Sequence, residues 1–119
     1  MQQNIAIFKI KQNDTLPVVK INVTTRGCLD EKIPFNLSGV TASTFSMADD
    51  CGSLKISSMP AQITCASGGT LQYNWIEGDT NVPGIFSAEF ELYFDDGKKI
   101  TVPTLGPLQV NIIKDINGV

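Results

Sequence analysis

Hydrophobic and polar residues alternate with a period of two along much of the chain, and Gly, Pro, Asn and Asp interrupt the alternation. This pattern is typical of β-strands that bury one face. It is clearest over residues 85–94, where Phe86, Ala88, Phe90, Leu92 and Phe94 alternate with Ile85, Ser87, Glu89, Glu91 and Tyr93. No stretch carries apolar residues at helical spacing over three turns without Gly or Pro nearby. The pattern therefore predicts an all-β protein.

The alternating segments and the turn residues between them predict seven to nine short strands. In chain order the segments are 5–11, 16–25, 39–47, 54–58, 61–66, 70–76, 85–94, 99–102 and 108–114. Short strands at intervals of about 8 to 12 residues are typical of a sandwich. We therefore expect an immunoglobulin-like antiparallel β-sandwich that forms one domain over residues 1–119. The segment 26–38 is expected to be a loop, and Asp96-Gly97 favours a type I′ hairpin turn.

The alternation also assigns side chains to the core. The residues expected to face inward include Val19, Ile21, Val23, Phe45, Met47, Leu71, Tyr73 and Trp75. For Tyr73 and Trp75 a second interpretation stays open, because two exposed aromatic rings on one strand face could stack on a sugar. A core position and a sugar-binding platform are thus the two alternatives for this pair.

Composition and charge narrow the range of functions. Hydrophobic residues make up 42 % of the 119 residues and charged residues 18 %, so we expect a folded domain with its own core. The net charge is −3 and no basic run is present, so we expect no nucleic-acid partner. No apolar segment is long enough for a membrane helix, and the first residues lack the apolar core of a signal peptide. We therefore expect synthesis in a cytoplasm and no membrane insertion.

Metal and redox chemistry have little support in the sequence. The chain has no histidine, the commonest metal ligand and general base. Cys28, Cys51 and Cys65 form no C-x-x-C pair, so we expect three reduced thiols, with a Cys51–Cys65 disulfide as the alternative. Acidic pairs at 49–50 and 95–96 are open to two interpretations, calcium binding and ordinary turns. We expect no cofactor and no bound metal.

The outward residues of segment 85–94 are the candidate functional surface. Glu89 and Glu91 lie two residues apart on one face, and paired carboxylates can serve a glycosidase. A solvated strand face explains the same pair without catalysis, so we expect no enzyme. Ile85 and Tyr93 lie on this face too, and large apolar groups beside carboxylates favour a protein-binding surface. These four residues are our candidate interface.

One stretch is more specific than the rest. Residues 71–80 read Leu-Gln-Tyr-Asn-Trp-Ile-Glu-Gly-Asp-Thr, and residues 83–92 read Pro-Gly-Ile-Phe-Ser-Ala-Glu-Phe-Glu-Leu. The order Tyr-x-Trp, Gly-Asp-Thr and Gly-x-aromatic-x-Ala-Glu-Phe resembles the N-terminal domain of phage upper baseplate proteins, an immunoglobulin-like family of tailed-phage structural proteins. The resemblance covers about residues 8–113. The residues that carry it are Tyr73, Trp75, Gly78, Asp79, Thr80, Gly84, Phe86 and Phe90.

The resemblance implies both structural roles and a function. Trp75 would fill the core, 78–80 would form a tight turn bonded through the Asp side chain, and Gly84 would let the chain enter the next strand. The implied function is a non-enzymatic structural protein of a tailed-phage virion, as an adaptor or attachment module in the baseplate, tail or neck. The implied partners are other tail or baseplate proteins and further copies in a trimer or hexamer, contacted through edge strands 5–11 or 108–114. The alternative is a carbohydrate-binding module for a host-surface glycan.

Overall fold

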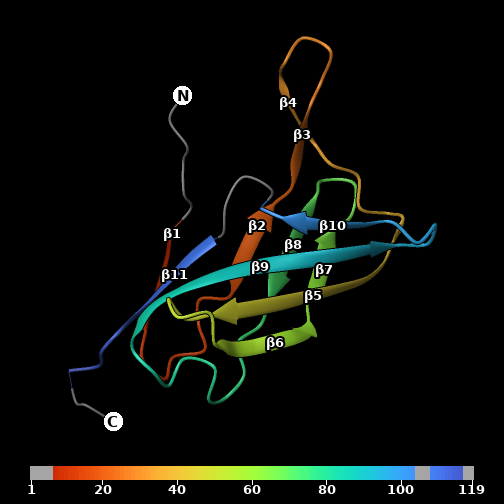
Figure 1. The fold of residues 1–119 in the computed structure, drawn as a ribbon. Coiled ribbons are helices and arrows are strands. Elements are labelled where there is room, and N and C mark those ends of the chain that lie inside the picture. Colours follow the sequence, from red (N-terminus) through yellow and green to blue (C-terminus); the bar gives the residue numbers. More distant parts are fainter. Residues whose placement is uncertain (1–6, 104–107, 117–119) are drawn as a thin grey trace.

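The computed structural model describes residues 7–103 and 108–116, and these residues form a sandwich of β-strands (Figure 1). The strands are β1 (Ile7–Lys11), β2 (Val19–Asn22), β3 (Thr24–Arg26), β4 (Lys32–Pro34), β5 (Val40–Ala48), β6 (Leu54–Pro60), β7 (Gln62–Cys65), β8 (Thr70–Tyr73), β9 (Gly84–Phe94), β10 (Lys99–Val102) and β11 (Leu108–Ile113). Within the described residues no helix is long and apolar enough to cross a membrane.

Two sheets make the two layers of the sandwich. The larger sheet has six strands in the order β1-β11-β9-β5-β6, with β10 also paired to β9. The long β9 pairs with β11 through its first half and with β10 through its second half. The smaller sheet has the order β2-β8-β7 and lies behind β9 and β5 in Figure 1. The pairing of β1 with β11 is parallel, which departs from the antiparallel arrangement that we expected.

The core lies between these sheets and is rich in aromatic rings. The even-numbered residues of β9 from Phe86 to Leu92 are buried, as the alternation predicts. From β5, Phe45 stacks on Tyr73 of the smaller sheet, with ring centroids 4.3 Å apart and an interplanar angle of 10°. The same ring meets Trp75 and Phe90 edge-on, a preferred geometry for aromatic pairs. The inward positions predicted for Phe45 and Met47 are confirmed.

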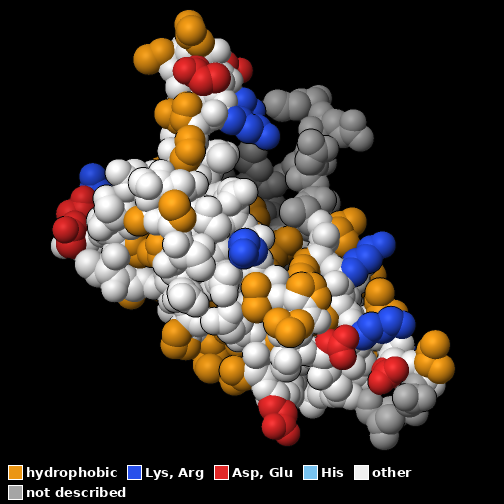
Figure 2. All heavy atoms as spheres, turned by 180° about the vertical axis from the view of Figure 1, so that it is seen from behind, with side chains coloured by type: hydrophobic (Ala, Val, Ile, Leu, Met, Phe, Trp, Pro, Cys, Tyr) orange, Lys and Arg blue, Asp and Glu red, His pale blue; other side chains and the backbone are white. Residues whose placement is uncertain are grey.

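A projecting hairpin replaces part of the loop expected at 26–38. Strand β3 pairs with β4, and every residue of the two strands is exposed. The tip closes through hydrogen bonds from the Gly27 amide to the Glu31 carbonyl and from the Asp30 amide to the Gly27 carbonyl. The hairpin stands out from the body in Figure 1, and hydrophobic side chains gather at its tip in Figure 2.

The predicted strand 16–25 is divided into β2 and β3 at Val23. The Val23 amide donates a hydrogen bond to the Gly69 carbonyl at 2.7 Å, and its carbonyl accepts one from the Phe35 amide at 2.9 Å. Both partners are far away along the chain, so the alternation around Val23 gives no sign of them. This division and the hairpin raise the number of strands above the seven to nine predicted.

Two further predictions of local structure are corrected. The turn after β9 is not type I′, because Gly97 has a positive φ of 86° and Asp96 does not. Residues 95–98 instead form a four-residue loop, in which Asp96 Oδ1 accepts the Lys98 amide. Strand 70–76 ends early, at Tyr73. Residues 5–6 of the first predicted strand lie outside the described residues, as do 104–107 of the interruption predicted before the last strand.

Candidate functional site

The outer face of the six-stranded sheet is the candidate functional site. The smaller sheet packs on the inner side, and no other described element covers the outer side. The register of the strands defines the outer face as Ile7, Lys9, Lys11, Ala42, Thr44, Ser46, Ala48, Leu54, Pro60, Ile85, Ser87, Glu89, Glu91, Tyr93, Lys99, Thr101, Gln109, Asn111 and Ile113. It includes all four candidate interface residues, because the odd-numbered side chains of β9 point away from the core.

Large apolar side chains are exposed on this face. Ile7 is 55 % exposed, Leu54 62 % and Ile85 60 %, and Ile113 is exposed beside them. The row that joins Ile7 to Leu54 across the sheet contains only Gln109, Ser87 and Ala48. Small side chains here leave a depression of about 220 Å³ between β5, β6 and β9. The middle of the outer face is therefore low and bordered by apolar groups, with Glu89 as a charged residue at the side of the depression.

The outer face carries an ion pair as well as charged groups that lie on separate strands. Glu91 Oε2 lies 3.0 Å from Lys99 Nζ, and this hydrogen bond raises the pKa of Lys99. The Tyr93 hydroxyl donates to Glu91 Oε1 at 3.3 Å. Lys9 and Lys11 lie on the edge strand β1, while Glu89 lies on the central strand β9. On this face Glu91 is thus paired with Lys99 and Tyr93.

The aromatic motif residues lie in the core rather than at a sugar site. Tyr73 is 2 % exposed and Trp75 5 %. The Tyr73 hydroxyl donates to Asp79 Oδ2, and Trp75 Nε1 donates to the Pro17 carbonyl at 3.0 Å. Neither ring has a face free for stacking, so the core alternative is confirmed for this pair. Tyr93 is half-buried on the outer face.

The remaining motif residues also serve the fold. Gly78 has a positive φ of 93°, and Asp79 Oδ2 accepts the Ile76 amide at 2.9 Å, which is the turn that the resemblance implies. Thr80 is buried and its hydroxyl donates to the Asp14 carbonyl at 2.8 Å. Gly84 begins β9 with a positive φ, and Phe86 and Phe90 lie in the core. None of these eight residues reaches the outer face, although Glu89 of the same stretch does.

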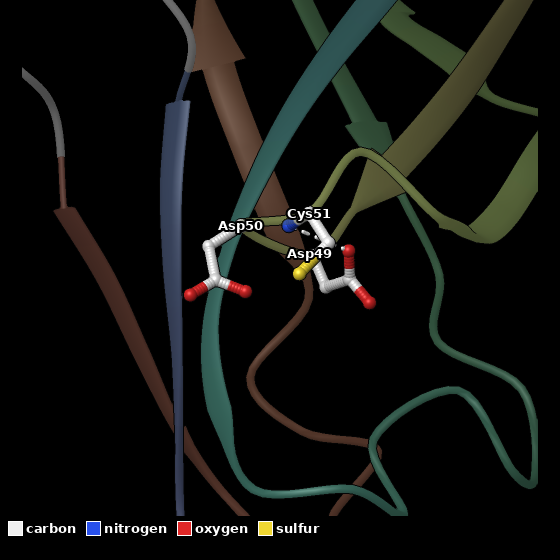
Figure 3. A group of neighbouring side chains, drawn as sticks. All are labelled: Asp49, Asp50 and Cys51. Carbon is white, nitrogen blue, oxygen red and sulfur yellow. Dashed lines mark hydrogen bonds between the residues drawn. The ribbon is translucent and has the colours of Figure 1, made fainter.

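The turn at Asp49, Asp50 and Cys51 could offer ligands to a metal ion (Figure 3). Their ligand atoms all lie within 4.8 Å of one another. Asp49 Oδ1, however, accepts the backbone amides of Cys51 and Ser53 at 3.0 and 2.9 Å, so this carboxylate already closes the turn. Figure 3 shows the Asp50 carboxylate on the other side of the Cys51 sulfur from Asp49. The donor set contains no imidazole, since the chain has no histidine.

The three cysteines do not pair with one another. Cys28, Cys51 and Cys65 are all free and exposed. Cys28 lies at the tip of the projecting hairpin, Cys51 in the turn before β6 and Cys65 at the end of β7. The Cys51–Cys65 disulfide, our alternative, is therefore not formed.

A groove that the sequence pattern did not predict lies at the flank of the sandwich, where the two sheets separate. It has a volume of about 410 Å³ and is lined by Val40, Thr41, Ala42, Ser43, Thr44, Pro60, Ala61 and Ile63. The groove forms because β6 ends at Pro60 and the chain crosses to β7 in the other sheet. Pro60 between two short strands is the one local signal of this crossing.

The sequence matches no protein-family model and no curated protein. Among solved structures, the fold is similar to the crystal structure of CopC from Methylosinus trichosporium OB3b, with a TM-score of 0.51 and 15 % sequence identity. The match covers 92 % of this chain and 85 % of that chain. At this identity the likeness concerns the fold alone, and it confirms the immunoglobulin-like β-sandwich that the sequence predicts.

The function expected from the sequence is wrong by this comparison. The matching structure is CopC, which supports neither a structural role in a tailed-phage virion nor the alternative of a carbohydrate-binding module. The physical reason is that the eight motif residues lie in the core, in turns or at a strand start. Such residues specify a sandwich and not an activity, so they carry a fold likeness without a shared function. The family resemblance itself stays a prediction from these motifs.

Proposed function

We propose that the protein is a non-enzymatic β-sandwich subunit that self-associates by packing its outer face against the outer face of a second copy. The observation that carries this proposal is the exposure of Ile7, Leu54, Ile85 and Ile113 on one uncovered sheet face. Exposed apolar residues scattered singly are normal, whereas several on one face mark an interaction site. The low row of Ser87 and Ala48 lets another sheet approach, since sheets pack about 10 Å apart.

Charge favours a second copy as the occupant of this face. In a two-fold interface the same surface meets itself, and an axis that lies between β1 and β9 places β1 of each copy over β9 of the other. The edge strand β1 carries Lys9 and Lys11, and the central strand β9 carries Glu89. The outer face is therefore complementary to its own copy in charge, which favours association in one register.

The test compares two substitutions of exposed isoleucines. Ile85→Lys places a charge in the apolar part of the outer face, and Ile76→Lys places the same charge at a 50 % exposed residue outside it. Light scattering over a wide range of concentrations should give a dimer for the natural chain and for Ile76→Lys, and a monomer for Ile85→Lys. A natural chain that stays monomeric, or equal masses for the two variants, overturns the proposal.

A charge exchange tests the register. Glu89→Lys should weaken the dimer, because the new positive charge at position 89 would then face the lysines of the partner's edge strand. Adding Lys9→Glu to Glu89→Lys restores opposite charges across the interface and should restore the dimer. If the double variant is no better than Glu89→Lys, the two outer faces do not meet in this register.

A further inference from the structure

The groove at the flank of the sandwich lies beside a strand that is paired on one side only. Strand β5 pairs with β9 along its whole length, from Val40 to Ala48. Its pairing with β6 ends at Thr44, and the last contact is the hydrogen bond from the Ala61 amide to the Ser43 carbonyl at 2.9 Å. Residues 40–42 therefore have a neighbouring strand in β9 and border the groove, and because the Val40 amide already donates to the Leu37 carbonyl at 3.0 Å, an added strand would pair at Thr41 and Ala42.

The bottom of the groove is apolar. Val40 belongs to the larger sheet and Ile63 to the smaller one, and both pack against the core while remaining partly accessible. Ile63 lies opposite the buried Leu71, so its side chain points between the sheets. Ala61 joins them from the crossing between β6 and β7. A strand laid beside residues 40–42 would cover all three of these side chains.

The groove carries no charge on any lining side chain. Extended peptides add to exposed sheet edges by main-chain hydrogen bonds, and the side-chain pockets beside the edge select which peptide fits. A charged side chain placed in this groove would lose its hydration without gaining a partner. The groove therefore fits an extended and uncharged segment.

We propose that this groove binds the first six residues of a second copy of the chain as an added strand beside β5. This segment, Met-Gln-Gln-Asn-Ile-Ala, has no charged side chain and lies outside the described residues. The segment leads directly into β1, which is the edge strand of the larger sheet opposite β6. In an added strand Ile5 would face Val40 and Ile63, which gives the contact its apolar anchor.

A chain cannot fill its own groove in this way. Three strand spacings separate β1 from β5, and seven residues along β9 separate Ser87, which aligns with Ile7, from Phe94, the partner of Val40. With about 4.8 Å between strands and about 3.3 Å per residue, the path from Ile7 to the groove is roughly 27 Å. Six extended residues reach only about 20 Å, and they must also lie along β5. The contact is therefore head-to-tail, which produces a ring or a linear assembly.

The test measures binding of a labelled peptide to the full chain by fluorescence anisotropy. The peptide carries residues 1–6, and the receptor carries Ile5→Lys so that its own segments do not compete. We expect saturable binding, at least tenfold weaker for a peptide with Lys in place of Ile5. Receptor Ile5→Lys/Ile63→Glu should lose binding at least tenfold. Receptor Ile5→Lys/Thr64→Glu, which puts the charge on the exposed side of the same strand, should bind normally.

Hydrogen exchange on the receptor that carries only Ile5→Lys covers the case in which Ile63→Glu does not fold. Peptide binding should slow hydrogen exchange of the amides in 40–43 and leave the β1 edge unchanged. No saturable binding, equal binding to both receptors, or no change in exchange at 40–43 overturns the proposal. The outer face is independent of this contact, so a receptor with Ile5→Lys/Ile85→Lys should bind the peptide as well as Ile5→Lys does. Failure here and failure of the outer-face dimer are thus separate results.

Discussion

The hydroxyl of Tyr73 donates a hydrogen bond of 2.6 Å to Oδ2 of Asp79 inside the core. The same carboxylate oxygen accepts the backbone amide of Ile76 at 2.9 Å. Strand β8 ends at Tyr73, and the chain then turns through Gly78, which has a positive φ. One buried carboxylate therefore holds both the end of a core strand and the loop that follows it. This explains why β8 is shorter than the alternation of Leu71, Tyr73 and Trp75 predicts.

Tyr73→Phe should lower the free energy of unfolding by about 1.5–3 kcal/mol, the range for hydrogen bonds to charged groups. The ring keeps its stacking on Phe45, so the loss reports the hydrogen bond to Asp79. Urea denaturation measures it. Tyr93→Phe is the matched control, because its hydroxyl lies 3.3 Å from Glu91 on a half-buried surface and should cost about 0.5 kcal/mol or less. Equal losses for the two variants would contradict this role for Tyr73.

Stability should fall at alkaline pH partly through Tyr73. Burial, and then the hydrogen bond to Asp79, raise the pKa of Tyr73 above its ordinary value of 10.0. Above that pH the unfolded chain loses this proton while the folded chain keeps it, so folding becomes less favourable as the pH rises. The slope approaches about 1.4 kcal/mol per pH unit. Tyr73→Phe lacks this contribution, so its stability gap from the natural chain should narrow above pH 10. A gap that stays constant in urea denaturation would contradict the raised pKa.

Local alternation predicts much of the sandwich because it follows directly from strand geometry. Residues 85–94 differ from β9 by one residue, and the side chains from Phe86 to Leu92 point inward as the pattern indicates. The four candidate interface residues lie on the outer face for the same reason. Alternation tells which side of a strand faces away from the core. It does not tell whether another layer covers that side, so the open face itself required the structure.

The features that the sequence does not reveal depend on contacts between distant residues. Val23 ends β2 through Gly69 and Phe35, and β1 pairs in parallel with β11 from the other end of the chain. The groove likewise forms where β6 leaves the larger sheet, beside a part of β5 that precedes it by about twenty residues. The motif of Tyr73 and Trp75 misled the functional prediction because these residues are conspicuous in sequence but buried in the fold.

The role of Asp49 can be tested by comparing an isosteric change with a truncation. Asp49→Asn keeps an oxygen that can accept the amides of Cys51 and Ser53, so stability should change by less than about 0.5 kcal/mol. Asp49→Ala removes that acceptor and should cost about 1 kcal/mol. A metal site predicts a different result, in which both variants lose a thermal stabilisation by added divalent ions that the natural chain shows. Thermal unfolding with and without such ions decides between a turn and a metal site.

Gly69 and Gly78 both have a positive φ, of 72° and 93°, but only Gly69 is enclosed by other backbone. A Cβ at Gly69 would clash with the Val23 carbonyl oxygen and lie 2.9 Å from the Phe35 carbonyl oxygen, at the base of the hairpin. A Cβ at Gly78 would have no heavy atom within 4 Å. Gly78→Ala should therefore cost only the left-handed backbone strain of about 1–2 kcal/mol. Gly69→Ala adds a backbone displacement and should cost about 3–5 kcal/mol in urea denaturation. Similar losses for the two variants would mean that the hairpin base yields to the added methyl group, and that the hydrogen bonds around Val23 do not hold it rigidly.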